Sequence, residues 1–200
     1  RLADTDRSVN ANGLAVHGTI TKNPVATGAD LVAYSGFSSS NYLEQPYNSD
    51  LDFGTGDFSI MGWVNHSATV GNTFIDRQNG AGSNVGRLQV GTVADGTLVI
   101  NVNGSVAYSP AASNLTWSLF VFTRTGGVVT GYINGQAGSP TTLTGAVTGA
   151  HNIVVGKNGN SASAYHGSLA LMRISATAPT AAQIKTIYEA EKPLFQENAQ

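Results

Sequence analysis

The stretch WSLFVFTRTGGVVTGYINGQ, residues 117–136, predicts one complete β-hairpin. Its first strand carries apolar side chains on both faces until its last positions. Gly126 and Gly127 then supply the positive φ that a tight hairpin turn requires. The return strand, Val128–Ile133, ends at Asn134-Gly135, which is a strong short-range turn signal. A tryptophan-led strand, a glycine turn and an aromatic strand that closes on Asn-Gly together predict two packed sheets.

The composition agrees with a single domain built from short strands and many turns. The chain has 200 residues, of which 24 are glycine and only 11% are charged, against roughly a quarter in an average soluble domain. A domain of this size can bury a sizeable core without disulfides, and the chain has no cysteine. Without cysteines, the redox compartment cannot be inferred from the sequence.

The charge and hydropathy patterns exclude two classes of partner. The net charge of -2 and the pI near 6.0 leave no basic field for a phosphate backbone, so we expect no nucleic-acid partner. No apolar run approaches the roughly 20 residues that a membrane helix needs, so we expect no membrane insertion. The chain begins at Arg1 with no secretory signal, which indicates a processed product or a piece of a longer protein.

Turn signals recur every 8 to 12 residues or so, which is typical of an all-β sandwich. In the strand predicted at 58–64, Phe58, Ile60 and Val64 share one face, and Met61 and Trp63 share the other. The remaining predicted strands are 15–20, 30–34, 41–43, 73–76, 87–93, 98–102, 152–155 and 168–174.

The end of the chain has a different pattern. Thr180 precedes AAQIKTIYEAEK, in which Ile184, Ile187 and Tyr188 recur at helical spacing. Thr180 is a suitable N-cap, and Pro193 should stop the helix. We therefore expect one short amphipathic helix against the sandwich. Leu194 and Phe195 follow it with no evident core to join, which indicates a connection to another domain or subunit.

Four features in order resemble the laminin G-like, concanavalin A-like jelly rolls. They are DRSVNANGLAVHGTI at Asp6–Ile20, LDFGTGDFSIMGWV at Leu51–Val64, the hairpin at Trp117–Gly135, and the strand Gly167–Ile174 with its following helix. The resemblance implies an antiparallel two-sheet jelly-roll sandwich with one short C-terminal helix. It implies a domain at residues 1–190 and an extension, linker or assembly segment at 191–200. The sequence segments LDFGTGDFSI and QIKTIYEAEKPLFQENAQ also resemble segments of bacteriophage tail and receptor-binding proteins.

Catalysis is disfavoured by the distribution of acidic residues. Glycoside hydrolysis, the activity of related jelly-roll glucanases, generally needs two carboxyl groups about 5–10 Å apart. The chain has four glutamates: three lie in or after the terminal helix, and Glu44 has no acidic partner nearby in sequence. Asp50, Asp52 and Asp57 lack calcium-loop spacing and are typical of turns. The four histidines are scattered, and no nucleophile elbow is present.

Two loops are candidates for a binding site, because loops carry function on rigid β scaffolds. One runs from Asp76 through Gly80 to Arg87, and the other runs from Lys157 through Asn160 to Tyr165 and His166. In the family, calcium or sugar is held at one rim of the sandwich by Asp, Asn and backbone carbonyls. The resemblance therefore makes Asp76, Asn158 and Asn160 the candidate metal ligands. One aspartate and two asparagines are few oxygens for calcium, so we expect no required cofactor and keep calcium as an alternative.

Sugar recognition usually needs an aromatic platform beside amide groups. Trp63 and Trp117 are expected in the core, whereas Tyr47, Tyr108 and Tyr165 lie in or beside loops where they would be exposed. Tyr165 with Asn158, Asn160 and His166 is the predicted ligand-binding surface, with His166 the histidine expected to be most exposed.

The sequence thus favours a non-enzymatic recognition or adhesion domain. The expected setting is a phage tail fibre or another receptor-binding virion protein, located on the virion or outside the cell, that contacts host-surface glycan or a receptor. The alternative is a structural decoration or fibre-assembly module that contacts other virion subunits, with a homotrimer as one arrangement. A glycan-cleaving enzyme of concanavalin A-like fold is the third interpretation.

Overall fold

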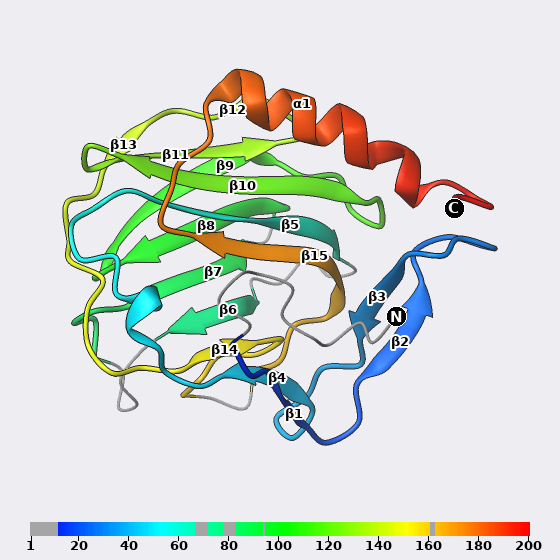
Figure 1. Cartoon of the computed structure of the whole chain (residues 1–200), viewed down its shortest axis with the longest axis horizontal. Helices are drawn as coiled ribbons and strands as arrows, with labels where there is room; N and C mark the ends of the chain where they lie inside the picture. The colour runs from blue at the N-terminus through cyan, green and yellow to red at the C-terminus, as the bar shows by residue number, and fades with distance from the viewer. Residues whose placement is uncertain (1–11, 67–71, 78–82, 94, 161–162) are drawn as a thin grey trace.

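The chain folds into two antiparallel sheets packed face to face, with one helix on the outside (Figure 1). The computed structural model describes residues 12–66, 72–77, 83–93, 95–160 and 163–200. Sheet A contains, in spatial order, β1 (Ala15–His17), β4 (Tyr42–Gln45), β14 (Ile153–Val155), β6 (Thr73–Arg77), β7 (Leu88–Thr92), β8 (Thr97–Val102) and β9 (Ser105–Ala111). Sheet B contains β12 (Gln136–Ala137), β11 (Val128–Ile133), β10 (Ser118–Thr125), β5 (Phe58–His66), β15 (Gly167–Ser175), β3 (Val32–Ser35) and β2 (Thr21–Pro24), with β13 (Thr141–Thr142) beside β11. The predicted all-β sandwich is confirmed.

The hairpin formed by β10 and β11 follows the pattern that its sequence predicts. The two strands pair from Phe120 opposite Ile133 to Thr125 opposite Val128. Gly126 and Gly127 have φ values of 55° and 80°, so both turn residues are in the left-handed region that favours glycine. β10 also pairs with β5, so the hairpin lies between β12 and β5 in sheet B.

The main core lies between the two sheets and is built by strand alternation. Sheet B contributes Phe58, Ile60, Val64, Phe120 and Phe122, and sheet A contributes Leu88, Val90, Leu98 and Ile100. All of these side chains are fully buried. The predicted inward face of the 58–64 strand is therefore confirmed for its three large residues.

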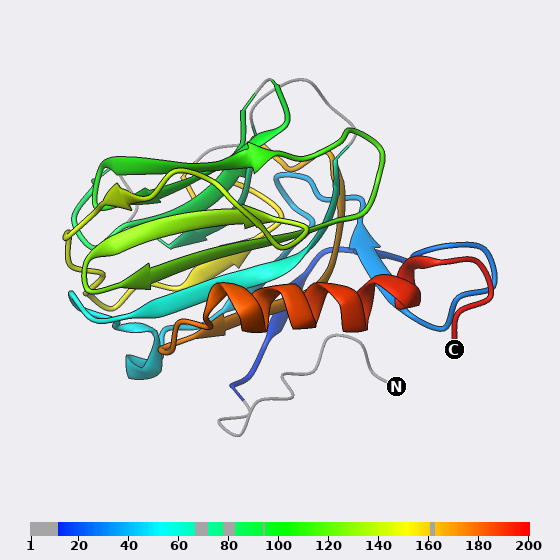
Figure 2. The ribbon, with the colours of Figure 1, turned by 90° about the horizontal axis from the view of Figure 1, so that it is seen from above.

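Helix α1 (Ala181–Glu191) lies along the outer face of sheet B (Figure 2). A second apolar cluster fills the space between the helix and the sheet. Met61 and Trp63 from β5 and Ile184 from the helix are buried there. Trp117 is partly buried in the same cluster, and its indole N–H donates to the carbonyl of Val25 at 2.9 Å. Trp63 is thus buried as predicted and Trp117 only partly, and both lie in the cluster under the helix.

Helix α1 begins at the predicted cap. The Thr180 side chain accepts from the Gln183 N–H, and the Gln183 side chain accepts from the Thr180 N–H, which forms a reciprocal capping box. A short 3-10 helix, η2 (Lys192–Phe195), follows.

The expectation that Phe195 has no core to join is wrong. Its ring stacks on Trp63 with 4.1 Å between ring centroids, and it lies 5.0 Å from Trp117. Beyond it, the Asn198 N–H donates to Thr27, and the Asp30 N–H donates to Ala199. The chain after α1 therefore packs back onto sheet B and its β2–β3 loop. Whether residues 191–200 also act as a linker or assembly segment stays a prediction.

Two buried arginines tie loops to the ends of the sandwich. Arg124 donates to the carbonyls of Gly54, Gly56 and Gly145, each at 2.7 Å. Arg77 donates to the carbonyls of Gly86, Thr148 and Gly149 and forms an ion pair with Asp52. Burial lowers the pKa of both guanidinium groups from the usual value.

The aspartates at 50, 52 and 57 lie in the turn segment that precedes β5, as predicted, and two of them bond to other segments of the chain. Asp50 lies in the 3-10 helix η1 (Ser49–Leu51), Asp52 pairs with Arg77, and Asp57 accepts the Gly126 N–H at 2.9 Å.

Within the described ranges, no helix combines the length and apolarity needed to cross a membrane. Two of the sequence features lie partly outside the residues that the structure describes. Residues 6–11 of the Asp6–Ile20 motif and residues 78–80 of the loop after Asp76 are not among the described residues.

Candidate functional site

The outer face of sheet A presents polar side chains that the alternation of β7 and β8 turns away from the core. Along these strands Leu88, Val90, Leu98 and Ile100 point inward. Gln89, Val99 and Asn101 therefore point to the opposite face, where each is partly exposed.

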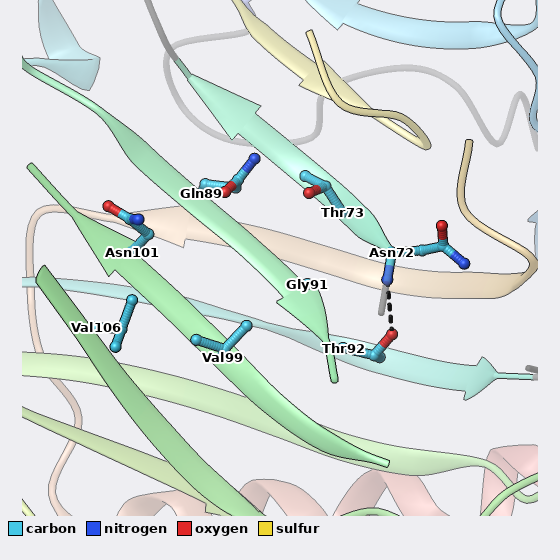
Figure 3. Close-up of a pocket in the computed structure, with 8 residues that line it drawn as sticks. All are labelled: Asn72, Thr73, Gln89, Gly91, Thr92, Val99, Asn101 and Val106. Atoms are coloured by element: carbon cyan, nitrogen blue, oxygen red, sulfur yellow. Dashed lines mark hydrogen bonds between the residues drawn. The ribbon is translucent and has the colours of Figure 1, made fainter. Parts of the chain in front are cut away.

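A shallow groove of about 220 Å³ lies on this face (Figure 3). We call it the outer groove; it is lined by Asn72, Thr73, Gln89, Gly91, Thr92, Val99, Asn101 and Val106. Amides and hydroxyls make up most of its side chains, and two valines supply apolar surface. The eight residues come from β6, β7, β8 and β9 and the residue before β6, so the groove crosses four strands.

Gly91 shapes the groove where β6 and β7 meet. A Cβ atom at this position would stand 2.8 Å from the Asn72 carbonyl oxygen, which is too close for any other residue. The β6–β7 register also shifts between Thr73 and Ile75, as at a β-bulge. The Thr92 N–H donates to the Asn72 carbonyl at 3.0 Å, and the Asn72 N–H donates to the Thr92 hydroxyl at 3.3 Å. The absence of a side chain at Gly91 leaves the groove open between these strands.

Gln89 offers a hydrogen-bond donor in the groove. Its amide oxygen accepts from the Arg87 guanidinium at 2.6 Å. Its amide nitrogen is buried and has no hydrogen-bond partner among the residues that the structure describes. A buried amide hydrogen without a partner is costly, so a ligand oxygen or a water that reaches it would be favourable. Asn101 lies on the next strand, and its side-chain oxygen accepts the Gly104 N–H at 2.9 Å.

An apolar and aromatic margin borders the outer groove on β9. Tyr108 lies opposite Val99 in the β8–β9 register, and Val106 lies opposite Asn101. Residues directly opposite each other share a face, so Tyr108 stands beside the groove. Its side chain is 49% exposed, which confirms the expectation that this tyrosine is accessible. An exposed aromatic ring next to amides is the combination that sugar recognition uses.

The outer groove carries no formal charge of its own, because none of its eight residues is acidic or basic. The nearest carboxylate by register is Asp76, which lies opposite Gln89. Asp76 is buried, and one of its oxygens accepts the Gly159 N–H at 2.7 Å. The groove is therefore better suited to a neutral polar ligand than to an ion.

The predicted metal ligands lie around the loop that follows β14. Gly159, which donates to Asp76, stands between Asn158 and Asn160 in the chain. The side-chain oxygen of Asn158 accepts the Asn160 N–H at 2.9 Å, as in an Asx turn. The structure thus brings Asp76 to this loop, but N–H groups occupy one oxygen of Asp76 and the oxygen of Asn158. Among the described residues, no group of three or more His, Asp or Glu side chains could hold a metal ion. A calcium site at these residues stays a prediction.

The four residues of the predicted ligand-binding surface do not form one exposed surface in the structure. Asn160 and His166 are exposed, but the expectation that Tyr165 is exposed is wrong, because it is 2% exposed. Its ring packs against Phe74 at 5.1 Å between centroids. Tyr165 and His166 line a second hollow, whose lining does not include Asn158 or Asn160. Ligand binding at these four residues therefore stays a prediction, without Tyr165 as an exposed platform.

The candidate acidic residues of an enzyme are bound to other groups of the fold. Glu44 accepts from the Asn152 amide at 2.7 Å and lies 3.5 Å from the His17 ring. Glu191 accepts from the Trp63 indole at 2.7 Å and pairs with Arg173. Asp52 and Asp57 are engaged as described above, so each of these four carboxylates contacts another part of the fold.

Sequence reasoning missed the outer groove because its residues lie on strands and not in loops. A signal was present, since Gln89 and Asn101 are the polar members of two alternating strands. β9 itself was not predicted, although Asn103-Gly104 forms the turn before it with φ values of 54° and 93°. Without β9, neither Val106 nor Tyr108 could be placed beside Asn101 and Val99.

Comparison with known proteins places the chain in a broad family. The model of a laminin G-like family, described as the concanavalin A-like lectin/glucanases superfamily, matches residues 37–185. A search of curated protein sequences found no match.

Solved structures share the fold at low sequence identity. The binding domain of Paraclostridial Mosquitocidal Protein 1 superposes with a TM-score of 0.72 at 16% identity, covering 93% of this chain and 49% of that one. The receptor-binding domain of botulinum neurotoxin C/D mosaic serotype gives 0.70 at 16% identity, with 94% and 48% covered. The binding domain of botulinum neurotoxin DC, solved in complex with rat synaptotagmin II, gives 0.68 at 15% identity, with 96% and 49% covered. This chain spans about half the length of each.

Proposed function

Since the chain belongs to the laminin G-like family of the concanavalin A-like lectin/glucanases superfamily, we propose that it is a non-enzymatic recognition domain that binds neutral glycan in the outer groove. The observation that carries the proposal is the exposed Tyr108 ring beside a groove of uncharged amides and hydroxyls. A sugar presents hydroxyls to such amides and an apolar C–H face to such a ring.

The groove chemistry favours this ligand class over others. An anionic ligand would need basic side chains, and a metal ion would need carboxylates, but the lining residues supply neither. Val99 and Val106 provide apolar contact, while Gln89 and Asn101 contribute amide groups. A small volume of about 220 Å³ suits a segment of one or two sugar residues lying across the strands.

Relatives of similar fold support a recognition role. Two of the superposed structures are receptor-binding or binding domains of botulinum neurotoxins, and one was solved with rat synaptotagmin II bound. The resemblance of two sequence segments to phage tail proteins supports a setting in a tail fibre or receptor-binding virion protein that contacts host-surface glycan. That setting places the domain on the virion or outside the cell.

The central test is a glycan array with the unmodified chain and with Tyr108→Ala. We expect binding to at least one neutral glycan and a loss of affinity of at least about tenfold in the variant, which corresponds to about 1.4 kcal/mol. Tyr47→Ala is the matched control, because Tyr47 is also an exposed tyrosine but, unlike Tyr108, does not lie opposite a groove residue in the strand register. Equal binding by both variants, with unchanged melting temperatures, would show that the groove is not the binding site.

Binding in the outer groove is proposed to require no cofactor. Calcium at Asp76, Asn158 and Asn160 is tested by calorimetric titration of the chelator-treated protein with CaCl₂. Heat of binding that disappears in Asp76→Asn, together with glycan binding that needs calcium, would replace the cofactor-free proposal.

The structural alternative, a fibre-assembly module, rests on Leu194 and Phe195 as an apolar contact for another subunit. Phe195 packs on Trp63 and Trp117 within the chain, which removes its part of that argument. Light scattering tests the arrangement directly: a trimer that dissociates on deletion of residues 193–200, with no glycan bound by the intact chain, would favour assembly. Reducing sugar released from a host polysaccharide would favour the enzyme.

A further inference from the structure

A second hollow, of about 370 Å³, lies at one end of sheet B and is separate from the outer groove. We call it the rim hollow. Its lining includes Ser35 at the end of β3, Asn65 near the end of β5 and Ser168 near the start of β15. Ser168 lies opposite Asn65 in the β5–β15 register, and Leu169 lies opposite Tyr34, next to Ser35. Three neighbouring strands therefore present a polar side chain each to the same end of the sheet.

These three side chains lie on the outer face of sheet B, beyond the region that α1 covers. Ala33, Trp63 and Ala170 are the neighbours two residues away on the same strands, and all three are buried in the cluster under the helix. No residue of α1 lines the rim hollow. The face thus changes from apolar and covered to polar and open within two residues along each strand.

The chemistry of the rim hollow is polar and uncharged. The side chains of Ser35, Asn65 and Ser168 offer hydroxyl and amide groups, and His166 is exposed at its margin. Phe37 borders the hollow, but its side chain is buried in the main core and offers little apolar surface. No acidic residue, lysine or arginine is part of the lining, so neither a metal ion nor a phosphate group has its usual ligands there.

Tyr165 adds an unused hydroxyl at the inner side of the rim hollow. Its ring is held in the main core, and its hydroxyl end lies next to Gly167, since a Cβ atom at Gly167 would stand 2.7 Å from the Tyr165 oxygen. That hydroxyl is buried and has no hydrogen-bond partner among the described residues. Burial also raises the pKa of this phenol, so it stays protonated and able to donate.

We propose that the rim hollow is a second carbohydrate subsite that binds one neutral pyranose residue through Ser35, Asn65 and Ser168. A pyranose offers several hydroxyl groups in a fixed geometry, which matches three polar side chains held by adjacent strands. A sugar hydroxyl, or a water that it orders, that reaches Tyr165 would satisfy its unpaired donor. The ligand class follows from the proposed function, but the location does not depend on the outer groove.

The test uses nuclear magnetic resonance of the ¹⁵N-labelled chain titrated with D-glucose, D-galactose or N-acetyl-D-glucosamine, with glycerol as the control for weak polyol contact. We expect saturable shifts of the backbone amides of Gly36, Phe37, Asn65 and Gly167 with at least one sugar and none with glycerol. Ser168→Leu should weaken that response at least tenfold, because the larger apolar side chain fills the hollow. Asn65→Leu is the second variant, in case the first lowers stability.

Tyr108→Ala separates the two sites. It should leave the rim response unchanged, because Tyr108 is not part of this lining. Amide shifts at the rim hollow with none at Gly91 or Val99 would support the rim subsite and contradict glycan binding in the outer groove. The inference is overturned if no sugar gives saturable rim shifts, if glycerol gives equal ones, or if Ser168→Leu and Asn65→Leu fold normally and bind unchanged.

Discussion

Phe195 stacks on the indole of Trp63 with 4.1 Å between ring centroids and 24° between ring planes. This contact joins the end of the chain to the middle of sheet B, because β5 lies between β10 and β15. Trp117, from the adjacent strand end, is the third ring of the group, at 5.0 Å from Phe195. The segment after α1 therefore forms part of the packing that covers the outer face of the sheet.

Phe195→Ala should lower the free energy of unfolding by about 2–3 kcal/mol. A fully buried phenylalanine costs about 3–5 kcal/mol when truncated, and Phe195 is only partly buried, so we expect the lower part of that range or less. Urea denaturation followed by tryptophan fluorescence measures the change. Val85→Ala, at an apolar side chain that is 68% exposed, should change stability by less than about 0.5 kcal/mol. An equally small effect in Phe195→Ala would contradict the packing.

Glu191 connects the same cluster to α1. Its carboxylate accepts from the Trp63 indole N–H at 2.7 Å and from Arg173. Glu191→Ala should destabilise the chain by about 1–3 kcal/mol, because it leaves the N–H of a buried indole without an acceptor. Glu191→Gln keeps an acceptor oxygen and should cost less. Arg173→Ala serves as the control for the ion pair, and since Arg173 is 41% exposed, its loss should cost at most about 1 kcal/mol.

Local patterns in the sequence were sufficient to predict the two-sheet sandwich and most of its strands, because turn chemistry and alternation act over a few residues. Gly126-Gly127 predicted a tight turn, and the residues on either side predicted two strands that pair as a hairpin. The same reasoning placed Met61 and Trp63 on the face opposite Phe58. It could not identify what covers that face, because the helix and Phe195 arrive from more than a hundred residues away.

The candidate sites show where local reasoning fails. Tyr165 follows a polar loop, which predicted exposure, but its ring packs against Phe74 from a distant strand. Gln89 and Asn101 were visible as polar residues in alternating strands, yet their grouping depends on the β7–β8 register and on Gly91. Such groupings depend on which strands pair and in which register, and local sequence patterns do not reveal this.

Arg124 should be more sensitive to substitution than any exposed cation. Its guanidinium donates to three carbonyl oxygens from two separate loops and lies over the Phe58 ring at 4.6 Å. Lysine has a single ammonium group and cannot reproduce the fork of donors, so buried carbonyls would lose their partners. Arg124→Lys should destabilise the chain by about 2–4 kcal/mol.

The matched control for Arg124→Lys is Arg173→Lys, at a partly exposed arginine. Its cost should stay below about 1 kcal/mol. Chemical denaturation of both variants compares them directly. Similar costs at the two positions would mean that the hydrogen bonds of Arg124 contribute little to the fold.

His66 should make stability depend on pH. Its ring is buried at the end of β5, and neither ring nitrogen has a hydrogen-bond partner among the described residues. Burial lowers its pKa below the ordinary value of about 6.5. Between that lowered pKa and about 6.5 the unfolded chain binds more protons than the folded chain. The free energy of unfolding therefore falls as the pH decreases through this window, by up to about 1.4 kcal/mol per pH unit.

Replacing His66 with an uncharged residue should remove this dependence. We expect His66→Leu to show a flatter stability profile between about pH 7 and pH 5, measured by urea denaturation at each pH. His166→Gln is the control, because His166 is exposed and its replacement should leave the slope unchanged. A slope that survives in His66→Leu but disappears in His166→Gln would show that the exposed histidine, and not the buried one, couples protonation to folding.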